Sequence, residues 1–178
     1  MDISELYQIY QAHPVITTDS RDCPEGSIFL ALKGASFDGN KFADMALEKG
    51  CAYVIIDEKE YAKEGDERYI LVEDCLTTFK ELAREHRRHF DIPVIGITGT
   101  NGKTTTKELV SAVLSEKFNV MFTQGNFNND VGVPKTLFRL SPENEIAVVE
   151  MGASHPGDIR KLVEYVEPTC GMITNVGR

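Results

Sequence analysis

Residues 94–106 have the sequence VIGITGTNGKTTT, and the rest of the chain is organised around this stretch. The apolar residues at its start predict a buried strand, and the Lys-Thr pair near its end predicts the first turn of a helix. A glycine-rich turn between a strand and a helix is typical of a phosphate-binding P-loop, because backbone N–H groups at a helix N-terminus attract anions. We therefore expect this stretch to bind a nucleotide phosphate.

Each part of the predicted P-loop has its own chemical role. Gly99 and Gly102 allow a tight turn and let the backbone approach the phosphates with no Cβ atom in the way. We expect Lys103 to place its ammonium beside the β and γ phosphates, and the Thr104 hydroxyl to ligate Mg²⁺. The predicted nucleotide-binding residues are Gly99, Thr100, Asn101, Gly102, Lys103, Thr104 and Thr105.

The spacing of the glycines makes this loop a variant. The general P-loop pattern has a glycine at the position that Ile97 occupies here. The loop also lacks the Gly-x-Gly opening of a dinucleotide-binding fingerprint. The alternative is a strand-to-helix turn rich in Gly and Thr that holds no ligand.

The composition indicates an α/β protein of the cytoplasm. The chain has 178 residues, enough for one and a half domains or two small ones, and 42% of them are apolar, which is enough for a buried core. No apolar run is long enough to insert into a membrane, and the acidic N-terminus lacks the apolar segment of a signal peptide. The net charge of −9 argues against a nucleic-acid partner. The scattered cysteines are expected to stay reduced, and they are Cys23, Cys51, Cys75 and Cys170.

The first half of the chain is predicted to form a small α/β domain. Apolar spacing predicts helices at residues 3–11 and 42–49 and strands at residues 15–17, 27–32, 52–56 and 69–72. An amphipathic helix follows at residues 74–90, and Asp91-Ile92-Pro93 ends it. The predicted domains are therefore residues 1–90 and 91–178.

Two histidines, His86 and His89, lie near the end of the helix at residues 74–90. Their spacing would allow both to ligate a metal, but the sequence offers no third ligand nearby. We instead expect a solvated helix end with positive side chains near its C-terminus.

Residues 91–178 are predicted to form a parallel sheet with crossover helices, because strands and helices alternate. Strands are expected at residues 94–98, 120–122, 146–149 and 171–174, with helices after Lys103 and at residues 156–165. The inner face of the helix after Lys103 is predicted to carry Leu109, Val110, Val113 and Leu114. The predicted fold class is α/β, with a small N-terminal α/β domain before a P-loop parallel sheet.

Two further features adjoin the P-loop in this prediction. Glu150 follows the strand at residues 146–149, and open α/β sheets bind ligands at the carboxyl ends of their strands. Its carboxylate could hold Mg²⁺ beside Thr104, or it could be a strand-end acid that faces water. The loop at residues 124–134 is rich in Asn, whose amides suit sugar hydroxyls and peptide groups, and an ordinary Asn-rich turn is the alternative.

Six motifs span nearly the whole chain, and they are Thr18–Arg21, Ile28–Gly34 with Phe37–Gly39, Gly99–Thr105, Asn128-Asn129 with Gly132–Pro134, Glu150–Ser154 and Ile173–Gly177. In sequence and in order they resemble the motifs of the Mur ligases of bacterial cell-wall synthesis. The Gly-Thr-Asn-Gly-Lys-Thr form of that family also accounts for the glycine missing from the general P-loop pattern.

The resemblance implies an ATP-dependent amide ligase. ATP would phosphorylate the carboxylate of a UDP-linked muropeptide, and an amine would then attack the acyl phosphate. The forms of Asn128-Asn129 and Glu150–Ser154 favour the family member that takes UDP-N-acetylmuramoyl-tripeptide and D-alanyl-D-alanine. The sister ligase that adds the third residue of the stem peptide is the close alternative.

The resemblance also assigns roles to residues. Lys103, Thr104 and Glu150 become the predicted catalytic residues, and Thr104 and Glu150 the predicted Mg²⁺ ligands. The predicted substrate-binding residues are Ser20, Arg21, Ala31, Lys33 and Gly34 for the UDP group, and Asn128, Asn129 and Ser154 for the sugar and peptide.

The family has three domains, and the resemblance covers the first domain and the opening part of the second, the ATPase domain. It therefore implies a truncated part of a longer enzyme, with little or no activity of its own. The alternatives for this stretch are a non-catalytic module that binds a nucleotide or a UDP-sugar, and an unrelated P-loop protein that acts as a switch.

Overall fold

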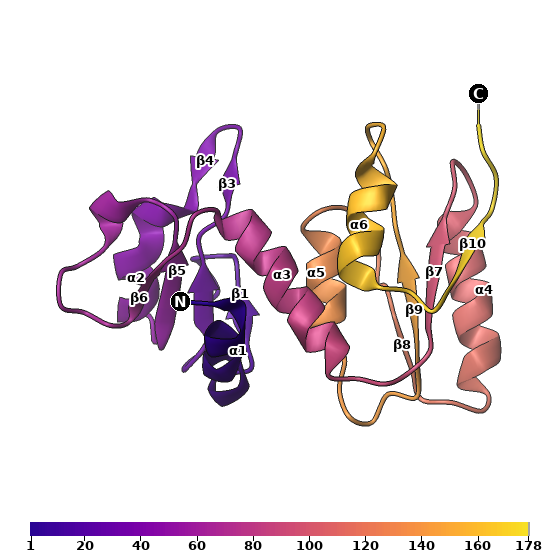
Figure 1. Ribbon diagram of the computed structural model, residues 1–178, viewed down its shortest axis with the longest axis horizontal. Coiled ribbons are helices and arrows are strands. Elements are labelled where there is room, and N and C mark those ends of the chain that lie inside the picture. The colour runs from indigo at the N-terminus through magenta and orange to yellow at the C-terminus, as the bar shows by residue number, and fades with distance from the viewer. Residues whose placement is uncertain (178) are drawn as a thin grey trace. The chain divides into compact units, whose positions relative to one another are not determined.

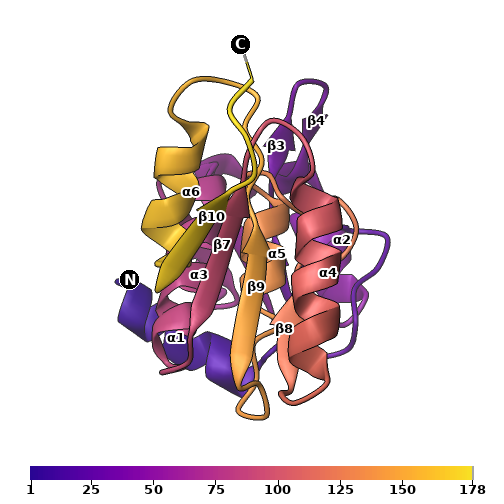
Figure 2. The ribbon, with the colours of Figure 1, turned by 90° about the vertical axis from the view of Figure 1, so that its right-hand side faces the viewer.

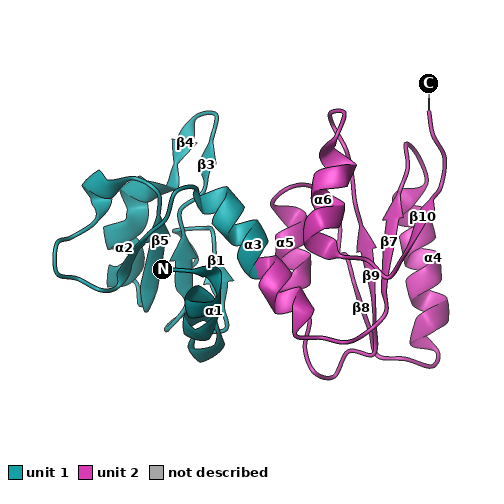
Figure 3. Cartoon of the chain, in the orientation of Figure 1, with its two compact units in different colours: residues 1–82 teal, residues 83–178 magenta. Residues whose placement is uncertain are grey.

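The computed structural model describes residues 1–177. The chain divides into two compact units, residues 1–82 and residues 83–178 (Figure 3). The division falls within helix α3 (Cys75–Arg88), shortly before the predicted boundary between residues 90 and 91. Arg178, the last residue of the predicted second domain, lies outside the described residues. The domain limits inferred from the sequence stay a prediction.

Unit 1 is built on a parallel sheet with strand order β1-β2-β5-β6 (Figure 1). Helix α1 begins where Asp2 and Glu5 form a capping box, in which each carboxylate accepts the other residue's backbone N–H. Strands β2 and β5 are buried almost throughout, as their continuous apolar sequences require. The elements are α1 (Ile3–Ala12), β1 (Ile16–Thr17), β2 (Ile28–Leu30), β3 (Lys33–Gly34), β4 (Phe37–Asp38), η1 (Gly39–Phe42), α2 (Ala43–Glu48), β5 (Tyr53–Ile56), η2 (Lys59–Tyr61) and β6 (Tyr69–Leu71).

Unit 2 is a parallel sheet with strand order β10-β7-β9-β8. Helix α4 packs on one face of this sheet, and α5 and α6 pack on the other (Figures 1 and 2). The predicted α/β class is confirmed. The elements are β7 (Val94–Thr98), α4 (Lys103–Ser115), β8 (Val120–Phe122), α5 (Gly132–Leu137), β9 (Ile146–Glu150), α6 (Asp158–Val166) and β10 (Cys170–Ile173). The core between the sheet and helices α5 and α6 is formed by Ala83, Val94, Met121, Val133, Leu137, Leu140, Ala147, Val149, Met151, Leu162 and Val166.

The predicted inner face of α4 is partly wrong. Leu109 and Val113 are 64% and 72% exposed, whereas Lys107 and Ser111 are buried against the sheet. The helix begins at Lys103, and steps of four residues place Lys107 and Ser111 on the same face as Lys103. The face that α4 packs against the sheet therefore follows from the P-loop before the helix. The most hydrophobic residues of α4 do not determine that face.

Three local predictions also differ from the structure. Residues 33–38 form the short antiparallel hairpin β3–β4, whereas the predicted strands and helices left these residues outside any element. Helix α5 occupies part of the predicted loop at residues 124–134, with Pro134 in its first turn, where the missing N–H costs nothing. His86 is buried and not solvated. Its Nε2 lies 3.0 Å from the Leu140 carbonyl oxygen, and burial lowers its pKa.

Among residues 1–177, no helix has both the length and the apolar character that a membrane span requires.

Candidate nucleotide-binding site

The carboxyl ends of β7, β9 and β10 meet at one edge of the unit 2 sheet, and the P-loop lies there (Figure 2). Gly99 has φ +141° and Gly102 has φ +79°, backbone angles that favour glycine. A Cβ atom on Gly99 would also collide with the Thr174 hydroxyl. The glycines are therefore required by the geometry of the turn that leads into α4.

The segment after β10 braces this loop. The N–H groups of Thr100 and Asn101 donate to the backbone and side-chain oxygens of Asn175, at 3.1 and 2.9 Å. In return, the Thr174 hydroxyl donates to the Asn101 carbonyl (2.6 Å), and the Gly177 N–H donates to the Thr100 hydroxyl (2.7 Å). Sequence analysis missed this brace, although the motif Ile173–Gly177 was the signal that could have indicated it.

These bonds limit which backbone groups can receive a phosphate. Because the N–H groups of Thr100 and Asn101 already have acceptors, the donors best placed to receive a phosphate are those at the start of α4, from the N-cap Gly102 to the exposed Thr105. The Lys103 ammonium lies over the loop and donates to the carbonyl oxygens of Gly99 (2.7 Å) and Thr100 (3.3 Å). The ammonium therefore lies beside the N-terminus of α4.

Glu150, the last residue of β9, is only 1% exposed. Its Oε1 accepts hydrogen bonds from the Thr104 hydroxyl (3.1 Å) and the Asn128 amide (2.8 Å). Its Oε2 is buried and has no hydrogen-bond partner within residues 1–177. A buried carboxylate oxygen without a partner is costly, and a divalent cation would relieve that cost. The donor set of Glu150 and Thr104 therefore fits Mg²⁺.

The Asn-rich loop is locked onto this carboxylate. The side chain of Asn128 faces Glu150, and the backbone carbonyl of Asn128 accepts the Gly152 N–H at 2.7 Å. A Cβ atom on Gly152 would lie 3.0 Å from Asn128 Cγ, so this approach favours glycine. The Asn129 Oδ1 accepts the N–H groups of Val131 (3.2 Å) and Gly132 (2.8 Å), which caps the start of α5.

The predicted contacts of Asn128, Asn129 and Ser154 with a sugar–peptide substrate stay predictions. Ser154 is exposed, and its N–H donates to Asp158 Oδ2 at 3.0 Å. The structure therefore places Asn128 in the same network as Glu150, gives Asn129 a role at a helix end, and leaves the Ser154 side chain at the surface.

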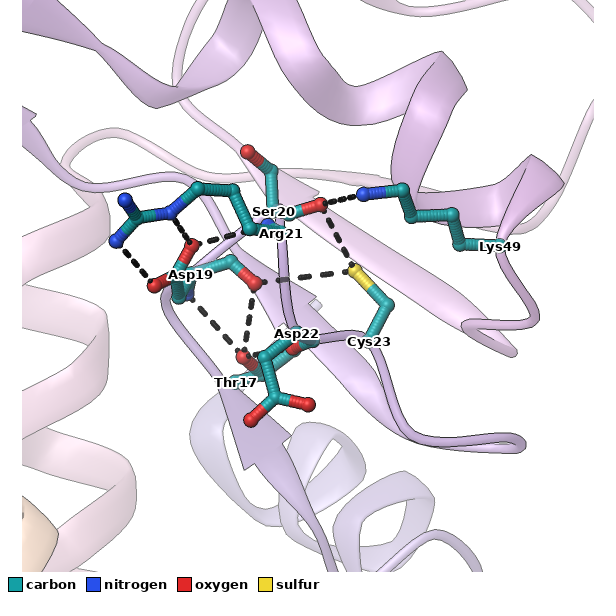
Figure 4. Close-up of polar contacts among 7 residues, drawn as sticks. All are labelled: Thr17, Asp19, Ser20, Arg21, Asp22, Cys23 and Lys49. Atoms are coloured by element: carbon teal, nitrogen blue, oxygen red, sulfur yellow. Dashed lines mark hydrogen bonds and ion pairs between the residues drawn. The ribbon is translucent and has the colours of Figure 1, made fainter.

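In unit 1, the loop after β1 carries two of the residues predicted to contact UDP (Figure 4). The Arg21 guanidinium donates to both oxygens of Asp19, at 2.9 and 2.7 Å, and these bonds raise its pKa. Ser20 is buried, and its carbonyl oxygen accepts the Lys49 ammonium at 2.7 Å. The strongly exposed Arg21 guanidinium therefore already has a carboxylate partner.

A second predicted group lies at the end of β2. Ala31 is fully buried, and Gly34 lies in the β3–β4 hairpin. The Lys33 ammonium pairs with Asp57 and Glu58, both at 2.8 Å, and these bonds raise its pKa. Burial alone would raise the pKa of Asp57, but its bonds with Lys33, the Cys75 N–H and Asn40 outweigh burial and lower it. 

Unit 1 also has a cavity of about 610 Å³ beside α1, β6 and the start of α3. Asp2, Glu73, Asp74 and Glu81 lie on its wall. An acidic wall repels a diphosphate, so this cavity is a poor match for a UDP group. The UDP site predicted from sequence uses other residues.

A P-loop at the carboxyl edge of a parallel sheet, with a buried strand-end carboxylate beside its Thr, is typical of nucleotide-binding proteins of the P-loop class. Comparison with known families is more specific. Residues 14–87 match the catalytic domain of the Mur ligase family, and residues 97–178 match the Mur ligase middle domain. The chain belongs to the Mur ligase family.

Curated relatives support this assignment. The UDP-N-acetylmuramoyl-tripeptide–D-alanyl-D-alanine ligase of Synechocystis sp. is 47% identical over 91% of this chain and 36% of its own length. The protein of the same name from Bacillus subtilis is 41% identical over 91% of this chain and 35% of its own length. The chain thus spans about a third of the length of these relatives.

Solved structures agree. The MurF of Acinetobacter baumannii aligns with a TM-score of 0.86 at 34% identity, over 96% of this chain and 40% of that chain. The MurF ligase of Thermotoga maritima, solved in complex with ADP, aligns with a TM-score of 0.84 at 39% identity, over 92% of this chain and 38% of that chain.

Proposed function

We propose that this chain supplies the UDP-binding and ATP-binding parts of a ligase that joins D-alanyl-D-alanine to UDP-N-acetylmuramoyl-tripeptide in peptidoglycan synthesis. The observation that carries the proposal is the Glu150 carboxylate, buried beside Thr104 at the P-loop with one oxygen unpartnered. The relatives at 34–47% identity that carry this ligase name support the choice of substrates. We also propose a cytoplasmic location, where a soluble UDP-linked substrate and ATP are both present.

The reaction requires an activated acyl group, because a carboxylate by itself is a poor acyl donor. The first turn of α4 receives the phosphates of ATP, and Lys103 moves from the loop carbonyls to the β and γ phosphates. The substrate carboxylate attacks the γ-phosphorus, ADP leaves, and an acyl phosphate forms. The amine of D-alanyl-D-alanine then attacks the acyl carbon and gives up a proton to solvent, and phosphate leaves with the pair of electrons of the broken C–O bond.

Thr104 and Glu150 are the residues that would hold Mg²⁺. When bound, the ion neutralises the charge of the phosphates during transfer. Asn128 keeps the Glu150 side chain in position through the 2.8 Å bond to Oε1, and Oε2, which has no hydrogen-bond partner within residues 1–177, would be available to a cation. In unit 1, Ser20, Arg21, Ala31, Lys33 and Gly34 would contact the UDP group.

The sister ligase that adds the third residue of the stem peptide is the second candidate. A solved UDP-N-acetylmuramoyl-L-alanyl-D-glutamate–2,6-diaminopimelate ligase aligns with a TM-score of 0.60 at 20% identity, which shows a shared fold alone. The higher identity of the D-alanyl-D-alanine ligases therefore favours the first candidate.

Isothermal titration of this chain tests the proposal, with UDP-N-acetylmuramoyl-tripeptide and Mg-ATP as separate ligands. Saturable binding of UDP-N-acetylmuramoyl-tripeptide, with a higher affinity than that for UDP-N-acetylmuramoyl-dipeptide, would support the proposal. If the UDP-dipeptide bound more tightly, the sister ligase would be favoured. If Mg-ATP bound and neither UDP ligand did, the chain would be better described as a P-loop switch.

A further inference from the structure

A buried lysine lies directly behind the nucleotide site. Lys107 belongs to α4, one turn after Lys103 and Thr104, and its side chain is 0% exposed. Its ammonium donates to the Thr123 carbonyl oxygen at 2.8 Å and to Glu108 Oε1 at 2.5 Å, and it lies 5.7 Å from the centre of the Phe122 ring. Burying an ammonium is costly, so packing alone does not explain a lysine at this position.

The acceptor of this lysine also holds Glu150. Thr123 follows β8 and is fully buried, and its N–H donates to the Val148 carbonyl of β9 at 3.0 Å. Its hydroxyl oxygen accepts the backbone N–H of Glu150 at 2.9 Å. Thr123 therefore connects the two residues: its carbonyl oxygen accepts from Lys107, and its hydroxyl oxygen accepts from the backbone of Glu150.

These contacts close a ring between the helix and the sheet. Thr104 and Lys107 belong to neighbouring turns of α4, and this helix lies across β8 and β9 (Figure 2). From Thr104 the ring runs through the Glu150 carboxylate, the Glu150 N–H and Thr123, and it returns to α4 at Lys107. Both ends of the ring belong to one helix. The ring therefore fixes the distance between the Glu150 carboxylate and Thr104 of the P-loop.

We propose that Lys107 is a positioning residue for the metal–nucleotide site. It acts through Thr123 to hold Glu150 at the distance from Thr104 at which both can ligate one divalent cation. It touches neither nucleotide nor metal. This inference rests on the nucleotide site proposed above, and it adds a residue that the P-loop pattern does not include.

The test compares ADP binding with and without Mg²⁺ in the unmodified chain and in Lys107→Met, which keeps the length of the side chain and removes its charge and donors. We expect the gain in ADP affinity that Mg²⁺ produces to fall about tenfold, while metal-free ADP affinity changes less than about twofold. A role in folding alone would change neither quantity once the protein is folded. Lys117→Met, at an exposed lysine just beyond α4, is the matched control and should leave both affinities unchanged.

A second variant acts at the other link of the ring. Thr123→Val removes the acceptor of the Glu150 N–H and keeps the carbonyl that Lys107 contacts, so it should reduce the Mg²⁺-dependent gain by a similar factor. Combined with Lys107→Met, it should add little further loss, because both changes break one ring. Circular dichroism reports whether each variant is folded, and if Lys107→Met is unfolded, Thr123→Val decides the question.

The outcomes separate the two proposals. If the unmodified chain binds Mg-ADP and the folded variants keep the full Mg²⁺-dependent gain, the positioning role of Lys107 is wrong while the nucleotide site stands. If the unmodified chain binds no ADP, the nucleotide site itself is wrong, and the role of Lys107 is overturned with it.

Discussion

The two units each bury a carboxylate at a predicted site, and the two carboxylates differ in how many of their oxygens are satisfied. Asp57 in unit 1 has partners at both oxygens, with Lys33 and Asn40 on Oδ1 and the Cys75 N–H on Oδ2. Glu150 in unit 2 has partners at Oε1 alone. We infer from this contrast that the first carboxylate serves the fold, whereas the open oxygen of the second suits the cation proposed above.

The largest expected effect is at the P-loop. Lys103→Ala removes the cation that we propose binds the β and γ phosphates, so the affinity of the chain for Mg-ATP should fall about 100-fold. Titration calorimetry measures this, with Lys117→Ala as a control at an exposed lysine. An unchanged affinity would show that the nucleotide binds away from the P-loop. The comparison between Asp57 and Glu150 would then lose its basis.

Asp57 tests the other side of the comparison. Asp57→Asn takes the charge from a buried, fully bonded carboxylate and leaves Lys33 with a weaker partner, so the free energy of unfolding should fall by about 2 kcal/mol. Urea denaturation measures the loss. Asp66→Asn removes an ion pair with Arg68 that is largely exposed, so it should cost clearly less stability than Asp57→Asn. Equal losses at the two positions would contradict a structural role specific to Asp57.

Glu150→Gln should show the opposite pattern. Removing the charge from the unpartnered oxygen relieves the cost of burying it, so the melting temperature should stay the same or rise. The Mg²⁺-dependent gain in nucleotide affinity should fall about tenfold, because an amide is a weaker ligand for Mg²⁺ than a carboxylate. If Glu150→Gln melted at a lower temperature and kept the Mg²⁺-dependent gain in affinity, Glu150 would have a structural role like that of Asp57.

The smallest expected effect concerns acid stability of unit 2 away from its site. Arg88 and Arg84 outweigh burial and lower the pKa of Glu167 from 4.5 to about 2. The ionised form is therefore favoured in the folded state, so its contribution is complete above pH 4.5 and is lost as the pH falls toward 2.

Glu167→Gln should accordingly lower the free energy of unfolding by about 1 kcal/mol at pH 7, a value reduced by the partial exposure of the pair. The difference from the unmodified chain should vanish near pH 2. Urea denaturation across this pH range measures it. A difference that stayed constant with pH would show that the ion pairs are not its source.

Part of the candidate site could be predicted because its information is local. The strand, the glycines and the Gly-Lys-Thr turn follow one another within residues 94–106, and the structure places β7, the turn and α4 there. The rotation of α4 was not predictable from hydrophobicity. Leu109 and Val113 suit a buried face, yet the turn at Gly102 directs Lys107 and Ser111 to the sheet.

The remaining contacts join residues that are distant in the sequence. The bond from Asn128 to Glu150, the brace of Asn175 on the P-loop, and the pairing of Lys33 with Asp57 each require the sheet to bring two loops together. Side-chain periodicity carries no information about such meetings, because it records only which face of one element is apolar.

The α/β class, the position of the P-loop and the resemblance to the Mur ligases could thus be inferred without coordinates, because each depends on short runs of neighbouring residues. Which polar groups satisfy one another became clear only from the folded chain. That outcome left one oxygen of Glu150 open and placed Lys107 behind it, because the pairing of buried charges depends on the packing of strands and helices in three dimensions.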